Sequence, residues 1–68
     1  MYKRQVKWYR KAAAQGDAEG QNNLGSLYEN GRGVPQDNME AMRLYRAAAK
    51  RGSLAARGNL ERLESLYE

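Results

Sequence analysis

Apolar residues recur along this chain with the spacing of amphipathic helices rather than of strands. One stripe falls at i, i+3, i+4, i+7 and i+8, which places five side chains on a single helix face: Ala41, Leu44, Tyr45, Ala48 and Ala49. Similar stripes cover residues 6–13, 18–28 and 54–67. The pattern predicts an all-α chain of four helices, over residues 3–15, 17–30, 38–51 and 53–67.

The expected helix ends carry residues that stop or start helices. Gly16 and Gly52 are each followed at once by an N-cap residue, Asp17 or Ser53, so neighbouring helices are expected to reverse direction sharply. Between the second and third helices lies a short ordered connector, Gly31 to Gln36. It contains Pro35, which blocks helix continuation, and Asp37 with Glu40 then has the spacing of a capping box.

The helix pairs form an internal repeat of 36 residues. Sliding the chain against itself by that distance aligns residues 8–28 with 44–64 and gives eight identities: Tyr9/Tyr45, Arg10/Arg46, Ala12/Ala48, Ala13/Ala49, Gly16/Gly52, Asn23/Asn59, Leu24/Leu60 and Leu27/Leu63. These are mostly residues that set packing and chain reversal, which is typical of a stacked helical repeat. Ala12, Ala13, Ala48 and Ala49 are expected at close contacts between helices.

Composition narrows the chemistry that the chain can perform. It has no cysteine and no histidine, which excludes disulfides, thiolate or imidazole metal sites and histidine-dependent nucleophiles. We expect no cofactor and no metal. No stretch resembles a signal peptide or a membrane span, so the expected product is one cytoplasmic domain over residues 1–68, with a thin core and no membrane partner.

The segment WYRKAAAQGDAEGQNNLGSLYENGRGVPQD, Trp8 to Asp37, resembles the repeat of the Sel-one-like family, a relative of the tetratricopeptide repeat. The later combination LYRAAAKRG strengthens the resemblance, which extends more loosely over Ala41 to Leu63. The resemblance implies an α–α solenoid that serves as an adaptor or scaffold. It also implies that the first helix of each repeat, here those starting at Asp17 and Ser53, lines a concave groove.

Three departures from the family pattern affect this expectation. Gly20 stands where alanine is usual, which costs about 1 kcal/mol of helix propensity unless close packing requires it. Glu61 and Glu64 make the outer face of the last helix polar, as in a terminal cap. The first helix corresponds to the second helix of a repeat, so no helix in the chain covers its N-terminal side, where Tyr2, Val6, Trp8 and Tyr9 lie.

The resemblance also selects the candidate partner-binding residues. Those expected to project into the groove are Glu19, Asn22, Ser26, Glu29 and Asn30, with Arg62 as the repeat-mate of Ser26. Of these, Asn22, Ser26 and Glu29 are expected to point into solvent, while Leu24 and Tyr28 are expected to be buried. Asparagine amides can hydrogen-bond the main chain of an extended peptide. Residues 17–30 hold three acids and no base, whereas residues 3–11 and 38–51 hold nine of the twelve basic residues, so the groove is expected to be mildly acidic and the convex side basic.

Other activities find little support in the residues. Trp8 and Tyr9 beside Arg10 and Lys11 could form a nucleic-acid platform, but helical spacing turns Tyr9 inward. We therefore expect no nucleic-acid partner, with weak binding by the basic convex face as the remaining exception. Gly31-Arg32-Gly33 lacks the strand and the Lys-Ser/Thr of a phosphate loop, and no carboxylate pair has an implied catalytic partner, so we expect no enzyme activity.

Two functions from different classes remain. The first is a protein-interaction module that binds a peptide or protein partner through the groove residues, or that stacks with another repeat protein through its open N-terminal face. The alternative is a structural unit that forms a homodimer through the open face of the first helix, using Tyr2, Val6 and Trp8. The repeat itself favours the first.

Overall fold

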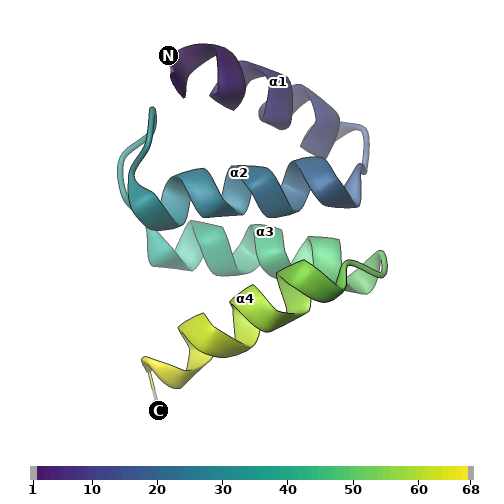
Figure 1. The fold of residues 1–68 in the computed structure, drawn as a ribbon, viewed down its shortest axis with the longest axis vertical. Coiled ribbons are helices and arrows are strands. Elements are labelled where there is room, and N and C mark those ends of the chain that lie inside the picture. The colour runs from purple at the N-terminus through teal and green to yellow at the C-terminus, as the bar shows by residue number, and fades with distance from the viewer. Residues whose placement is uncertain (1, 68) are drawn as a thin grey trace.

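The fold is a succession of four antiparallel α-helices (Figure 1). The computed structural model describes residues 2–67, and the side chains of residues 3–67. The helices are α1 (Tyr2–Ala14), α2 (Ala18–Asn30), α3 (Asn38–Lys50) and α4 (Leu54–Ser65). Each begins and ends within two residues of the predicted position. The described residues contain no strand, and the prediction of an all-α helical repeat is confirmed.

Glycines and caps close the tight turns as the sequence predicts. Gly16 and Gly52 have φ values of 81° and 99°, in the left-handed region that costs glycine little. The Asp17 carboxylate accepts a hydrogen bond from the backbone N–H of Glu19 at 3.0 Å, and the Ser53 hydroxyl accepts one from Ala56 at 3.1 Å. These bonds satisfy N–H groups that have no partner inside the helix.

The start of α3 uses only half of the predicted capping box. Asp37 accepts from the N–H of Glu40 at 3.1 Å, but the Glu40 carboxylate turns to Arg43, at 2.6 and 2.8 Å. The backbone N–H of Asp37 donates instead to the carbonyl of Tyr28 at 2.9 Å. The connector is therefore fixed to the end of α2, and an arginine one helical turn away competes successfully for the glutamate.

Two apolar clusters hold the helices together, and α3 contributes to both. The larger cluster joins α3 to α4 and consists of Ala41, Met42, Tyr45, Ala48, Ala56 and Leu63, with Ala18, Tyr28 and Leu60 packed against it. The smaller cluster joins α1, α2 and α3 and consists of Val6, Leu24, Leu27 and Leu44. Ala48 is fully buried, whereas Ala12, Ala13 and Ala49 are half-buried. The two clusters fix the order and spacing of the helices.

The unusual Gly20 is explained by the close approach of α1 to α2. A Cβ atom built on Gly20 would lie 2.6 Å from the Cβ of Ala12 and 3.1 Å from the backbone nitrogen of Ala13. Non-bonded Cβ atoms essentially never approach other atoms so closely, so glycine is required at this contact. The loss of helix propensity is offset by the packing that it permits.

Candidate functional site

Side chains of α2 and α4 meet along one face of the molecule, which we call the α2–α4 face. Asn59 Nδ2 on α4 donates to Asn22 Oδ1 on α2 at 3.0 Å. Further along, Arg62 of α4 pairs with Glu29 of α2 through both guanidinium nitrogens, and Arg62 Nη2 lies 2.9 Å from Glu29 Oε1. The Tyr45 hydroxyl of α3 donates to the same oxygen at 2.8 Å. These polar contacts link two helices that are not adjacent in sequence.

The charge on Glu29 is stabilised by these partners. The hydrogen bond from Arg62 is the main cause that lowers the Glu29 pKa below its ordinary value, against the opposing effect of partial burial, and Tyr45 adds to the lowering. The same hydrogen bond raises the pKa of Arg62. The Tyr45 pKa is also raised, first by burial and then by its bond to Glu29, so this hydroxyl remains a donor. Glu29 is thus the centre of a small charged network.

The remaining candidates lie along the outward side of α2. Glu19 is exposed and Ser26 is half-buried. Asn30 is exposed, but its Nδ2 donates to the carbonyl of Ser26 at 2.9 Å and lies 3.4 Å from the Ser26 hydroxyl. Asn23 is half-buried and has no side-chain hydrogen bond within residues 3–67. Its position between Glu19 and Ser26, at helical spacing, makes it part of the same row.

The six predicted groove residues are therefore brought to one face, but they differ in availability. Leu24 is buried beneath them as expected, while Tyr28 is only half-buried. Asn22, Ser26 and Glu29 were expected to point freely into solvent, and all three are half-buried. Asn22 and Glu29 are held by α4, because antiparallel packing of α3 on both helices brings their polar sides within hydrogen-bond distance.

Sequence reasoning missed the residues that make these connections. Asn59 and Tyr45 bind across helices, and Asn23 completes the row on α2. The identities Asn23/Asn59 and Tyr9/Tyr45 in the repeat could have pointed to them, because a polar residue kept at the same repeat position is a candidate for a contact between repeats. No sequence signal identifies Gln21, whose buried Oε1 meets no hydrogen-bond donor among the described residues.

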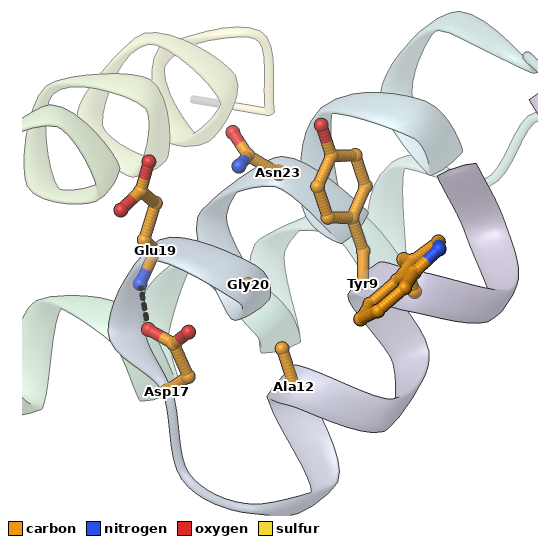
Figure 2. Close-up of a pocket in the computed structure, with 7 residues that line it drawn as sticks. Tyr9, Ala12, Asp17, Glu19, Gly20 and Asn23 are labelled. Carbon is orange, nitrogen blue, oxygen red and sulfur yellow. Dashed lines mark hydrogen bonds between the residues drawn. The ribbon is translucent and has the colours of Figure 1, made fainter.

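An open hollow of about 340 Å³ lies between α1 and α2. Its lining residues are Trp8, Tyr9, Ala12, Asp17, Glu19, Gly20 and Asn23. Figure 2 shows Tyr9 on α1 and Asn23 on α2, which both line the hollow, with the Asn23 amide pointing away from the Tyr9 ring. The hollow combines aromatic surface, one amide and two carboxylates.

The predicted self-association surface needs correction. Val6 is only 7% exposed and packs with Leu24, Leu27 and Leu44, so it stabilises the interior and does not lie on an open face. Val6 belongs to the smaller apolar cluster because α1 packs this side chain against residues of α2 and α3. Trp8 is 71% exposed, as the prediction requires. The side chain of Tyr2 lies outside the described residues.

Arg4, Lys7 and Lys11 are exposed along α1 beside Trp8, so basic side chains follow its outer surface. Within the described part of the chain, no group of three or more carboxylate, histidine or cysteine side chains could hold a metal ion. None of its helices is long and apolar enough to cross a membrane.

We expect Glu29 and Arg62 to stabilise the fold jointly. In a double-mutant cycle of Glu29→Gln and Arg62→Gln, the coupling at pH 7 should be about 0.5–1 kcal/mol, because Arg62 is still half-exposed to water. The folded-state pKa of Glu29 is lowered, so this contribution is present above the unfolded value, about 4.3, and is lost as the pH falls through the folded value. Urea unfolding at pH 7 and near pH 2.5 measures it. A coupling that persists in acid would contradict the ionic pair.

The geometry defines a helical-repeat protein with a polar interhelical face. The Sel1 repeat family model matches residues 6–17 and 18–53, which are most of the chain. The chain therefore belongs to the Sel1 repeat family, and the resemblance found in the sequence is confirmed. Proteins of this family are generally adaptors for protein interactions rather than enzymes.

One curated relative is "DAP3-binding cell death enhancer 1" of Mus musculus. It is 39% identical over 64 residues, which cover 94% of this chain and 12% of that protein. The chain thus spans a small part of the relative's length. No solved structure matches the chain.

Proposed function

We propose that this chain is a non-catalytic protein-interaction module that binds a segment of another polypeptide across the α2–α4 face. The observation that carries the proposal is the row Glu19, Asn23, Ser26 and Asn30 on α2, beside a helix held at a fixed distance. The Asn22–Asn59 and Glu29–Arg62 contacts order this face before a partner arrives. A pre-ordered surface loses less entropy on binding.

The chemistry of the face indicates the kind of segment that it would bind. Asn23 offers an amide donor and acceptor for a main-chain peptide group. Asp17 and Glu19 place negative charge at the start of α2, and no basic residue on α2 offsets it. Glu29 is already neutralised by Arg62. The expected ligand is therefore an extended segment with a basic residue near Glu19.

The relative supports the class of function. Its name states that it binds DAP3, which is a property of that protein, and the region shared with this chain spans 12% of it. A protein-binding role for the shared repeats is consistent with that name.

Selection from a displayed peptide library on the immobilised chain tests the proposal. Selected peptides should be enriched in Lys or Arg, and Glu19→Lys should weaken them about tenfold or more in calorimetry. Glu61→Lys is the matched control, because its repeat-mate Gly25 faces α3 rather than the α2–α4 face. Failure to select any peptide, or equal weakening by both substitutions, would overturn the proposal.

Homodimerisation through α1 is the second candidate, and the exposed Trp8 is the observation that favours it. Val6 does not contribute to that surface, because its side chain is buried. Sedimentation equilibrium between 1 and several hundred micromolar tests it directly. If the chain dimerises in this way, the wild type should form a dimer, and Trp8→Lys should abolish the dimer without changing the helix content. A wild-type mass that stays monomeric over the whole range would exclude this candidate.

A further inference from the structure

The same repeat positions are covered at one end of the molecule and open at the other. Leu44 of α3 is 4% exposed, whereas its repeat-mate Trp8 on α1 is 71% exposed. Tyr45 is 1% exposed, whereas its repeat-mate Tyr9 is half-buried. The sequences of these positions are similar, so the difference comes from what packs on them.

Helix α2 provides the cover for α3 and α4. The ring of Tyr45 lies against Gly25, where an added Cβ would be 2.8 Å from Cε1. The Tyr45 hydroxyl donates to Glu29, and Asn59 donates to Asn22. Three positions of α2, at i, i+3 and i+7, thus contact the following helix pair. Asn22 binds Asn59, whereas Gly25 and Glu29 contact Tyr45.

The corresponding place on α1 and α2 is the open hollow (Figure 2). Three of its lining residues are the repeat-mates of residues that α2 covers: Tyr9 of Tyr45, Ala12 of Ala48, and Asn23 of Asn59. Neither the Tyr9 hydroxyl nor the Asn23 amide has a hydrogen-bond partner in the described part of the chain. The Tyr9 hydroxyl and the Asn23 amide can therefore each donate a hydrogen bond to an acceptor on a molecule that docks in the hollow.

We propose that the hollow between α1 and α2 is a docking site for a helix of a partner protein that carries the pattern of α2. That helix has an amide residue at i, glycine at i+3 and a carboxylate at i+7, as Asn22, Gly25 and Glu29 do. Its glycine lies under the Tyr9 ring, its carboxylate accepts from the Tyr9 hydroxyl, and its amide accepts from Asn23. The helix also covers the indole of Trp8, which adds apolar burial.

A second copy of this chain does not supply such a helix. Its α2 is already packed between α1 and α3. Its α4 has Gly58, Glu61 and Ser65 at the three pattern positions, so a glutamate side chain occupies the space that the tyrosine ring requires. Glu61 is exposed and pairs with Arg57 at 3.5 Å. Head-to-tail stacking of copies is therefore blocked at α4, and the docking helix belongs to a different protein.

Trp8 is the single tryptophan of the chain and reports directly on this site. The first probe is a capped peptide with the sequence of residues 17–31, which contains no tryptophan. We expect a saturable blue shift of Trp8 emission. Gly25→Glu within the peptide should weaken binding about tenfold or more, because overpacking at such a contact is worth that factor. Tyr9→Phe and Asn23→Ala in the protein should each weaken it about threefold or more.

A tethered form reduces the entropy cost of association, because docking becomes intramolecular. Residues 17–36 are placed directly before Met1, which keeps the 36-residue period. The tethered chain should show a blue-shifted Trp8 emission and a higher Tm than the same chain with Gly25→Glu in the added segment. Equal emission and equal Tm in the two tethered chains would overturn the proposal.

Two further outcomes would also overturn it. One is docking only in the tethered chain, with no response to the free peptide up to its solubility limit, because a separate partner would then not bind. The other is a blue shift that follows the concentration of the chain alone together with a doubled mass, because the occupant would then be a second copy. The hollow shares Glu19 and Asn23 with the α2–α4 face, but Ser26 does not line it. Ser26→Ala should therefore leave the Trp8 response unchanged, which separates this inference from the proposed function.

Discussion

Truncation of Tyr45 to alanine is expected to cost about 3–5 kcal/mol of the free energy of unfolding. Tyr45 is one of the two largest fully buried side chains, lies in the cluster that joins α3 to α4, and contacts α2 at Gly25. A folded chain of this length has roughly 3–10 kcal/mol in total. The Tyr45→Ala protein should therefore be largely unfolded at 37 °C, as measured by circular dichroism and urea titration.

Tyr9→Ala is the matched control, because Tyr9 occupies the same repeat position on α1. Its side chain is only half-buried beside the smaller cluster, so the loss should be about half as large or less. Tyr45→Phe removes the hydroxyl and keeps the ring. It should lower the free energy of unfolding by about 1 kcal/mol, because the hydrogen bond to Glu29 is lost. Equal losses for Tyr45→Ala and Tyr9→Ala would contradict the unequal covering of the two repeats.

The fold was accessible from the sequence because several independent signals agree. The i, i+3, i+4 stripes, the glycine turns at Gly16 and Gly52, and the caps Asp17 and Ser53 all place helix ends at the observed positions. These signals are local, and each depends on residues within one helical turn. The 36-residue repeat then adds the order of packing, since equivalent helices make equivalent contacts.

The site was less accessible because it depends on side-chain directions that two helices set together. The periodicity assigns Glu29 and Arg62 to outward faces, but it does not show that α3 brings them together. Val6 is a different case, because its spacing with Tyr9 and Ala13 already places it on the inward stripe of α1, nearly opposite Trp8, so its assignment to an open face conflicted with the periodicity. Contacts between helices that are not sequence neighbours require the crossing geometry, which the repeat period alone does not supply.

A second large effect is expected at Gly25, where alanine should destabilise the fold although it favours helix formation. The added methyl would lie 2.8 Å from Tyr45 Cε1 and 3.3 Å from the carbonyl oxygen of Ala41. Neither group can retreat easily, because Tyr45 is 1% exposed and the carbonyl belongs to the backbone of α3. Overpacking of this kind costs about 1–3 kcal/mol, more than the gain of up to about 1 kcal/mol in helix propensity.

Gly58→Ala provides the comparison with the same chemistry and no obstruction. Gly58 lies within α4, and nothing stands within 4 Å of the position of its Cβ. That substitution should raise the free energy of unfolding by about 0.4–1 kcal/mol, because alanine reduces the entropy of the unfolded chain. Urea titrations of the two variants beside the wild type should therefore shift the midpoint in opposite directions. If Gly25→Ala instead stabilised the chain as Gly58→Ala does, the close contact of α2 with the Tyr45 ring would be wrong, and with it the glycine required of a helix that docks over Tyr9.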